Sequence, residues 1–263
     1  MSQGPRRFPL ALERVGASPQ ADRSRVARRD EPPRAGGSRE SAGIGLDSQA
    51  VRARMVQRLR VEGVTCEPVL AALAQVPRHQ FVDPGLAAQA YEDTSLPIGL
   101  DQTISKPSVI ARMLSLLFEG REALQSGSLG RVLEIGTGCG YQAALLSLLA
   151  RQVISVERLR PLFDRARDNL APLRSDKLRL VYADGRLGHA PNAPYDTIIC
   201  AAGGDDVPTA WLEQMALGGR LVAPTRSAAG TGQILLVVDR SVDGWSRRSH
   251  EAVNFVPLRS GTA

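Results

Sequence analysis

The chain contains few of the side chains on which nucleophilic and metal-dependent enzymes rely. It has three cysteines and three histidines in 263 residues. The cysteines, Cys66, Cys139 and Cys200, form neither a CxxC pair nor a metal-binding spacing. The sequence therefore argues against a disulfide framework and against a metal site, and its unpaired thiols fit a reducing cytoplasm.

Aromatic residues and long apolar runs are also scarce. Aromatics make up 4% of the chain, which leaves few platforms for stacked bases, so we expect no specific nucleic-acid partner. Tyr141 and Trp211 are expected to serve in packing. No apolar run approaches the roughly 18 residues that cross a bilayer, and the N-terminus lacks a signal-peptide apolar region. We therefore expect a cytoplasmic protein without a membrane partner.

The basic charge of the chain is concentrated near its start. The net charge is +6 and the pI is near 9.8. The first 50 residues hold nine arginines and six acidic residues, which is half of the excess. This stretch has scattered Pro, Gly and Ser and few large apolar residues, so it cannot bury enough surface to offset chain entropy. Its acidic residues argue against a mitochondrial transit peptide. We expect residues 1–45 to form a disordered basic tail.

Helical periodicity begins after this tail. One helix is predicted from about residue 47, with Asp47 as a possible N-cap, and a second over residues 66–76, with Pro68 in its first turn. A third begins near Lys106, after a loop that contains LPIGLDQTIS. We expect residues 46–120 to hold the N-terminal helices and a substrate loop.

From Arg131 onward, short β-rich runs alternate with helical patterns. The predicted strands are RVLEI, QVISVE, KLRLVYA, YDTIICAA and GRLVAP, and the last predicted helix is PTAWLEQMAL at 208–217. QILLVVDRS and HEAVNFVPL form a closing hairpin around an Asp-Gly turn, with FVPL as part of an edge strand. The pattern predicts an α/β fold over residues 121–263: a doubly wound, mostly parallel seven-stranded sheet with an antiparallel edge.

The most informative motif is VLEIGTGCGY at residues 132–141. A buried strand runs into Gly136, Gly138 and Gly140 and then into a helix. Glycines here allow a sharp turn and close approach of a ligand at the carboxyl end of the sheet. The GxGxG spacing differs from the GxGxxG of dinucleotide-binding proteins. Alone, the loop leaves open both a nucleotide-type cofactor and a simple tight turn.

Two acidic positions extend this pattern. Glu157 ends the next strand, where a carboxylate can accept both hydroxyls of a ribose. Asp184 and Gly185 end the following strand, where they could receive an adenine amino group and pack its ring. Each has a structural alternative: Glu157 could be a helix cap, and Asp184 could only shape a turn.

A longer series of motifs stands in one order over residues 50–258. They are VPRHQFVDP, AYEDTSLPIG, QTISKP, VLEIGTGCGYQAA, DG with the following Gly188, APYDTII, LEQMALGGRLVAP and FVPL. In these motifs the sequence resembles class I S-adenosylmethionine-dependent methyltransferases, which have a Rossmann-like fold, and within them the protein-L-isoaspartate O-methyltransferases. QTIS is not shared by methyltransferases in general.

The resemblance implies an enzyme that transfers methyl from S-adenosylmethionine to the α-carboxylate of L-isoaspartyl residues. Its partners would be damaged, unfolded proteins and peptides, whose repair then proceeds through a succinimide, and it would act as a monomer. By the same resemblance, the catalytic residues are Ser105, Thr103 and Gln102. The implied cofactor-binding residues are Glu134, Gly136, Thr137, Gly138, Gly140, Glu157, Arg158, Asp184, Gly185 and Ala201.

This chemistry explains why an acceptor loop can do without His or Cys. A carboxylate acceptor is already ionised and the sulfonium donor is already activated, so no base is needed and alignment dominates. Neutral donors such as Ser105 and Thr103 can hold the carboxylate without neutralising it, whereas a cation on the nucleophilic oxygen would stabilise the ground state more. A helix N-cap is the alternative role for Ser105.

Two departures from the family pattern affect the expected site. Asp101 replaces the usual glycine before QTIS, which should remove access to positive φ and add a negative charge that must be turned away or paired with Lys106. Gly203 and Gly204 replace Ala or Pro and are expected to loosen one wall of the pocket.

Other functions remain open at this point. The chain could methylate a small molecule or RNA, or bind the cofactor with a decayed acceptor site. CAAGG replaces the D/N-PP-Y/F sequence expected for adenine amino methylation, and no Pro-Cys pair supports cytosine C5 methylation. An NAD-dependent oxidoreductase is disfavoured by the GxGxG spacing.

Overall fold

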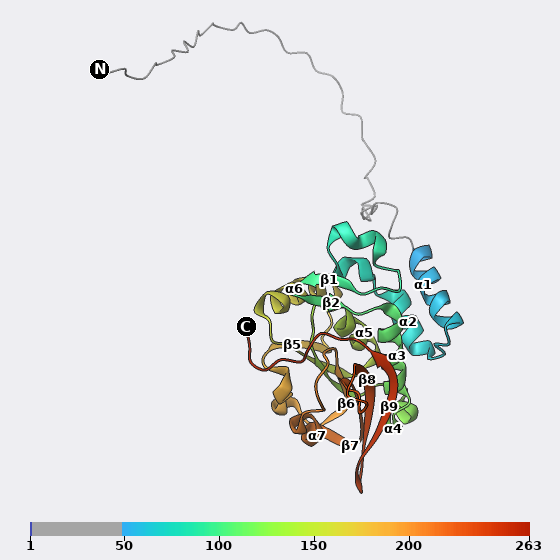
Figure 1. The fold of residues 1–263 in the computed structure, drawn as a ribbon. Coiled ribbons are helices and arrows are strands. Elements are labelled where there is room, and N and C mark those ends of the chain that lie inside the picture. Colours follow the sequence, from blue (N-terminus) through green and yellow to red (C-terminus); the bar gives the residue numbers. More distant parts are fainter. Residues whose placement is uncertain (2–48) are drawn as a thin grey trace, which may run out of the picture. The chain divides into compact units, whose positions relative to one another are not determined.

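The computed structural model describes Met1 and residues 49–263 (Figure 1). The predicted tail at 1–45 and the predicted cap Asp47 lie outside the residues described from 49 onward. Residues 49–263 belong to one structural unit. No helix among them has the length and apolarity that a membrane span requires.

A seven-stranded sheet forms the centre of the fold. Its strands lie in the order β5-β4-β3-β6-β7-β8-β9; β3 to β7 pair in parallel, and β8 and β9 are antiparallel. This confirms the predicted doubly wound sheet with an antiparallel edge. The strands are β3 (Arg131–Ile135), β4 (Gln152–Glu157), β5 (Leu178–Tyr182), β6 (Tyr195–Cys200), β7 (Met215–Arg226), β8 (Gln233–Ser241) and β9 (Gly244–Val253).

Helices cover both faces of this sheet. The α-helices are α1 (Gln49–Val61), α2 (Glu67–Gln75), α3 (Pro107–Phe118), α4 (Arg121–Ser126), α5 (Tyr141–Leu149), α6 (Arg160–Leu170) and α7 (Thr209–Gln214). Short 3-10 turns are η1 (Arg78–Phe81), η2 (Pro84–Gln89), η3 (Ala171–Leu173), η4 (Gly185–Leu187) and η5 (Ala190–Asn192).

Alternation along the strands creates two hydrophobic clusters. Val132 belongs to the cluster that contains the buried faces of α1, α2, α3 and α5, whereas Leu133 belongs to a second cluster with Trp211 of α7. Successive side chains of a strand point to opposite faces, so a continuous apolar run serves both clusters. The N-terminal helices therefore share one core with the sheet.

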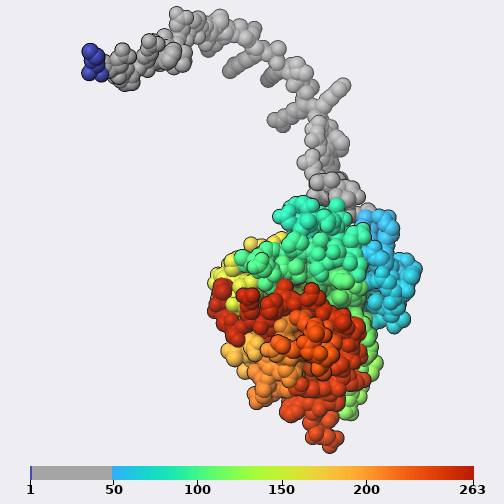
Figure 2. Space-filling view, in the orientation of Figure 1, coloured from blue at the N-terminus to red at the C-terminus, as the bar shows by residue number. Residues whose placement is uncertain are grey.

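Two elements end earlier than the sequence predicts. The helix predicted at 208–217 ends at Gln214, because buried Met215 already pairs with β6 and begins β7. The strand predicted to include FVPL ends at Val253, and Pro257 makes only an isolated bridge to Gly203. A proline has no N–H to donate to a ladder. In Figure 2 these red C-terminal residues border the green residues around 100.

The acceptor loop also has more structure than expected. Residues 96–104 form an antiparallel hairpin of β1 (Leu96–Gly99) and β2 (Gln102–Ile104). Leu100 and Asp101 at its turn have φ values of 54° and 56°. The expectation that Asp101 loses access to positive φ is wrong, since aspartate tolerates the left-handed region. Asp101 is exposed, and within residues 49–263 it forms no ion pair with Lys106.

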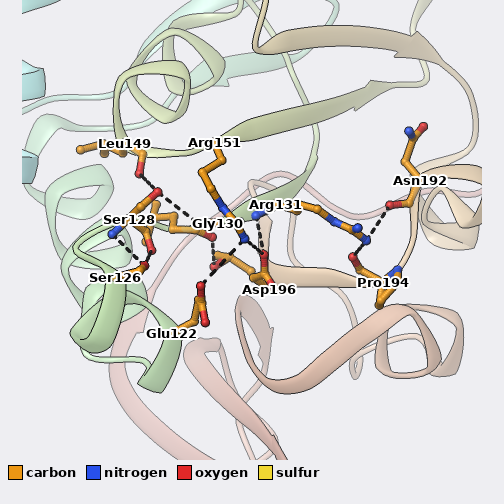
Figure 3. Close-up of polar contacts among 12 residues, drawn as sticks. Glu122, Ser126, Ser128, Gly130, Arg131, Leu149, Arg151, Asn192, Pro194 and Asp196 are labelled. Atoms are coloured by element: carbon orange, nitrogen blue, oxygen red, sulfur yellow. Dashed lines mark hydrogen bonds and ion pairs between the residues drawn. The ribbon is translucent and has the colours of Figure 1, made fainter.

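A polar network closes the amino end of the sheet, opposite the glycine loop (Figure 3). Oδ2 of Asp196 accepts hydrogen bonds from the Arg131 backbone N–H at 2.7 Å and from Arg151 Nη2 at 3.1 Å. The Arg131 side chain donates to the carbonyls of Asn192 and Pro194. Asp196 thereby joins β6 to β3 and to the turn before β4. Gly130 lies against this carboxylate with φ of 66°.

We predict that Gly130→Ala destabilises the fold more than Gly127→Ala. Both glycines have similar positive φ, 66° and 68°, so alanine is strained at both. A Cβ at Gly130 would lie 2.4 Å from Asp196 Oδ2, whereas a Cβ at Gly127 meets nothing within 4 Å. We expect a loss of about 1 kcal/mol for Gly127→Ala and about 2 kcal/mol more for Gly130→Ala in urea unfolding. Equal losses would show that Asp196 gives way freely.

Candidate cofactor and acceptor site

The glycine loop turns between β3 and α5 at the carboxyl end of the sheet. Its start is fixed by hydrogen bonds from the N–H groups of Gly136 and Thr137 to the Val156 carbonyl, at 2.9 and 3.3 Å. Gly140 serves the packing of α6, because a Cβ there would lie 2.9 Å from Leu170 Cδ1. The loop is therefore held by β4 on one side and by α6 on the other.

A cavity opens beside this loop and brings together most of the predicted site residues. It is bordered by the glycine loop, the ends of β4 and β6, the β1–β2 hairpin and the residues after β9. The predicted residues that line it are Gln102, Thr103, Ser105, Gly136, Thr137, Gly138, Glu157, Arg158, Gly185 and Ala201. Glu134, Gly140 and Asp184 do not line it.

Glu157 connects the end of β4 to the glycine loop. Its Oε2 accepts from the Gly138 N–H at 2.8 Å, and its Oε1 accepts from the N–H groups of Arg158 and Leu159 at 2.8 and 2.9 Å. The side chain is 4% exposed and borders the cavity. Glu157 thus shapes the local backbone and also presents a carboxylate to the cavity.

Glu134 lies beneath the glycine loop in a buried polar network. Gln142 Nε2 donates to its Oε1 at 3.0 Å, and its Oε2 lies 2.5 Å from the Ser155 hydroxyl, which is 2.6 Å from the Thr137 hydroxyl. Burial raises the pKa of Glu134 to about 8, although the hydrogen bonds from Ser155 and Gln142 oppose the shift. Glu134 itself does not line the cavity. It supports two residues that do, Gln142 directly and Thr137 through the Ser155 hydroxyl.

Both carboxylate oxygens of Asp184 accept hydrogen bonds from backbone N–H groups. Its Oδ1 accepts from the Arg186 N–H at 2.9 Å, and its Oδ2 accepts from the Gly261 N–H at 2.6 Å. The bond from the Arg186 N–H forms a turn, which is the structural role that the sequence left open for Asp184. Gly185, next to it, borders the cavity, and its carbonyl accepts from Trp211 Nε1 at 2.8 Å.

Sequence reasoning missed part of the C-terminal wall of the cavity. Residues 256–259 line it after the end of β9. Gly203 holds this segment through two 2.8 Å bonds, from its N–H to the Val256 carbonyl and from the Leu258 N–H to its own carbonyl. A Cβ at Gly203 would lie 2.3 Å from Gln233 Nε2. The expectation that Gly203 and Gly204 loosen this wall is therefore wrong, because Gly203 anchors it.

Ser105 does not cap α3. The helix has Lys106 at its N-cap position, and the backbone N–H of Ser108 in its first turn is satisfied by Asp93, which precedes β1. Asp93 accepts from the Ser108 N–H at 2.9 Å and from the Ser108 hydroxyl at 2.8 Å. The Ser105 carbonyl accepts from Arg78 Nη2 at 2.8 Å, and its hydroxyl makes no hydrogen bond within residues 49–263.

Ser105 also borders a second hollow on the other side of the loop. This hollow, here called the acceptor hollow, is lined by Ser95, Ser105, Lys106, Val109 and residues 252–255. Ser105 therefore lines both the cavity beside the glycine loop and the acceptor hollow.

Comparison with known proteins identifies the family of the chain. The chain is 59% identical to the protein-L-isoaspartate O-methyltransferase of Methylibium petroleiphilum, with all of both chains covered. It is 56% identical to that of Leptothrix cholodnii, covering 100% of this chain and 97% of the relative.

Solved structures share the fold. A structure named protein-L-isoaspartate O-methyltransferase matches with a TM-score of 0.69 at 26% identity, over 80% of this chain and 66% of that one. A Plasmodium falciparum chain crystallised with S-adenosyl-L-homocysteine matches with a TM-score of 0.68 at 21% identity, over 79% of this chain and 98% of that one. The predicted class I methyltransferase fold is thus confirmed. Since the family's sequence profile matches residues 50–263, the chain belongs to the protein-L-isoaspartate(D-aspartate) O-methyltransferase family.

Proposed function

We propose that this chain transfers the methyl group of S-adenosylmethionine to the α-carboxylate of L-isoaspartyl residues in damaged, unfolded proteins and peptides. The methyl ester then permits ring closure to a succinimide, which begins repair. The observation that carries the proposal is the position of Ser105 between the cavity and the acceptor hollow, with a hydroxyl that no described residue uses.

The residues around the cavity fit an S-adenosyl cofactor. Close backbone approach is possible at Gly136 and Gly138, and Glu157 offers a carboxylate at the end of β4, where doubly wound folds hold ribose hydroxyls. Apolar side chains of Ile135, Leu159 and Leu162 supply a surface for a flat ring. When bound, the cofactor supplies a methyl carbon attached to a positively charged sulfur. Arg158, Gly185 and Ala201 complete the proposed cofactor site.

The acceptor side provides neutral hydrogen-bond donors. Gln102, Thr103 and Ser105 line the cavity, while histidine and lysine are absent from the lining that the described residues form. Burial raises the pKa of the Cys139 thiol, so this lining residue stays protonated and is a poor nucleophile. The proposed roles of Ser105 and Thr103 are to orient the acceptor carboxylate, with Gln102 shaping the loop through its 3.1 Å bond to the Leu100 carbonyl.

The peptide around the isoaspartyl residue would lie in the acceptor hollow. Residues 252–255 form one side of it. Gln233 fixes this side, because its amide accepts from the Phe255 N–H at 2.8 Å and donates to the Phe255 carbonyl at 3.2 Å. An extended peptide with little side-chain preference suits such a shallow, mixed surface.

We also propose a cytoplasmic monomer that acts on protein and not on nucleic acid. The three cysteines are free, with Cys139 and Cys200 buried, which suits a reducing compartment. Few aromatic residues are available for base stacking. Size-exclusion chromatography with light scattering would test the monomer.

The function itself is tested by methyl transfer. Full-length protein with S-adenosylmethionine carrying a labelled methyl group should label a peptide that contains L-isoaspartate and leave its aspartyl counterpart unlabelled. Labelling of RNA or of a small molecule, with no labelling of either peptide, would assign another acceptor. Binding of S-adenosylmethionine without any transfer would indicate a decayed acceptor site.

We predict that Ser105→Ala lowers turnover of an isoaspartyl peptide by more than about tenfold, since one donor to the acceptor is lost and small misplacement is costly in an alignment-dependent reaction. The affinity for S-adenosylmethionine, measured by calorimetry, should change little. Ser108→Ala is the matched control. It loses the hydrogen bond to Asp93 and should lower stability by about 1 kcal/mol while turnover stays within about threefold of wild type. Wild-type turnover in Ser105→Ala would remove this hydroxyl from the mechanism.

We predict that Glu134→Gln flattens the pH dependence of stability. The pKa of Glu134 is raised from 4.5 to about 8, so the folded protein holds a proton that the unfolded chain releases between these values. Wild-type stability should therefore decline from pH 4.5 to pH 8, with this group contributing of the order of 5 kcal/mol. Glutamine can preserve both hydrogen bonds without ionising.

The measurement is urea unfolding at several pH values, together with the affinity for S-adenosylmethionine. Glu213→Gln, at an exposed position of α7, is the control and should keep the wild-type slope. An unchanged slope in Glu134→Gln would mean that Glu134 ionises freely in the folded protein.

A further inference from the structure

One buried charge in the molecule has no role in the function proposed above. Arg78 comes from the motif VPRHQFVDP and begins η1, and it is 0% exposed. Its Nε donates to the Ala90 carbonyl at 2.7 Å and its Nη2 to the Ser105 carbonyl at 2.8 Å. Within residues 49–263 it forms no ion pair; Asp93, the carboxylate that acts on its charge, does so from beyond ion-pair distance and bonds Ser108. Burying a charge without an ion-pair partner is costly, so a purely structural role is a poor explanation.

Arg220 shows what a charge-paired buried arginine looks like in the same protein. It is 6% exposed, and its Nη1 donates to the Leu116 carbonyl at 2.7 Å. Unlike Arg78, it pairs with a carboxylate, through bonds of 2.6 and 2.9 Å to Asp239. The two arginines therefore differ in their ion pairing and in their place: Arg220 lies between α3 and the strands β7 and β8, and Arg78 lies behind the acceptor loop.

Arg78 also touches the first residue of α5, at the other side of the site. Its Cζ is 5.0 Å from the centre of the Tyr141 ring, and Tyr141 lines the cavity. Arg78 Nη1 and the Tyr141 hydroxyl are both buried and have no other hydrogen-bond partner in the described part of the chain, and the two side chains interact with each other. One guanidinium thus contacts the acceptor loop and the helix that follows the glycine loop.

The bond to the Ser105 carbonyl fixes a whole peptide plane. The peptide bond between Ser105 and Lys106 is trans, so the Lys106 N–H points in the direction opposite to the carbonyl that Arg78 holds. Ser105 and Lys106 both border the acceptor hollow. Because this plane is fixed, the direction of the Lys106 N–H is fixed, and so is the backbone from which the Ser105 side chain projects.

We propose that Arg78 is a positioning residue of the acceptor site: it holds the Ser105–Lys106 peptide in place and supplies, from behind the loop, a positive charge that favours an anionic acceptor. This inference rests on the function proposed above. Because the guanidinium bonds the loop carbonyl, it attracts the acceptor carboxylate without sharing the oxygen that must attack. Its hydrogen bond acts on catalysis through Ser105, whereas its charge acts on the acceptor carboxylate directly.

The test uses Arg78→Lys and Arg78→Met in the full chain. Lysine keeps the charge but cannot bond the carbonyls of Ala90 and Ser105 in the same geometry; methionine removes the charge and keeps much of the volume. We expect kcat/KM for an isoaspartyl peptide to fall by about tenfold or more in both variants, and further in Arg78→Met. The affinity for S-adenosylmethionine, measured by calorimetry, should stay within about threefold of wild type.

Arg220→Lys is the matched control for disturbing a buried arginine. It should lower the melting temperature and leave kcat/KM unchanged. A double variant supplies a second readout: because the hydrogen bond of Arg78 acts through Ser105, adding Arg78→Lys to Ser105→Ala should cost less than the product of the two single losses. If Arg78→Met does not fold, the proposal is tested by the kcat/KM values of Arg78→Lys and of this double variant.

Three outcomes would overturn the proposal. They are wild-type kcat/KM in either folded variant, a loss of S-adenosylmethionine affinity as large as the loss in kcat/KM, and fully multiplicative losses in the double variant. The wild-type assay separates this failure from failure of the function. If wild type labels the isoaspartyl peptide and an Arg78 variant matches it, only the role of Arg78 is wrong; if wild type labels no isoaspartyl peptide, both proposals fall.

Discussion

The two hydrogen bonds from Ser108 to Asp93 determine what the acceptor loop can do. A helix that begins after a serine would ordinarily use that serine to satisfy its first N–H groups. Here Pro107 removes one of those N–H groups and a carboxylate from another loop serves Ser108, so the hydroxyl of Ser105 stays available at the border of two cavities. The catalytic proposal depends on this arrangement, because a Ser105 hydroxyl bonded to the helix N-terminus could not also orient the acceptor carboxylate.

The cofactor side is held in a similar way by groups that lie behind the surface. Glu157 accepts three backbone N–H groups and thereby fixes the end of β4 against Gly138. Glu134 supports Gln142 and, through the Ser155 hydroxyl, Thr137, by accepting hydrogen bonds from Gln142 and Ser155. A preformed loop of this kind needs little reordering when a ligand binds, so less of the binding free energy is spent on conformational entropy.

The sequence predicted the sheet and the part of the cavity lining around the glycine loop, because both follow from local patterns. Strand periodicity located β3 to β6 and β8 closely, and the glycine spacing located the cavity. What it could not predict depended on tertiary contacts. Met215 belongs to β7 because it pairs with Tyr195 of β6. The Ser108 N–H of α3 is satisfied by Asp93 and not by Ser105. Gly203 fixes the C-terminal segment because it bonds Val256 and Leu258. Asp184 illustrates the same limit, since its bond to Gly261 joins residues far apart in the chain.

The placement of charge suits a reaction between an anion and a sulfonium. Both charges diminish as the methyl group moves, so any group that binds the attacking oxygen strongly would hold the reactants back. The side chains proposed to orient that oxygen, Ser105 and Thr103, are uncharged, and the buried cation Arg78 lies behind the loop and is bonded to a carbonyl. A cation in that place can favour arrival of a carboxylate through longer-range attraction, which changes little over the short path of the methyl group. Attraction and alignment are thereby assigned to different residues, Arg78 for the first and Ser105 for the second.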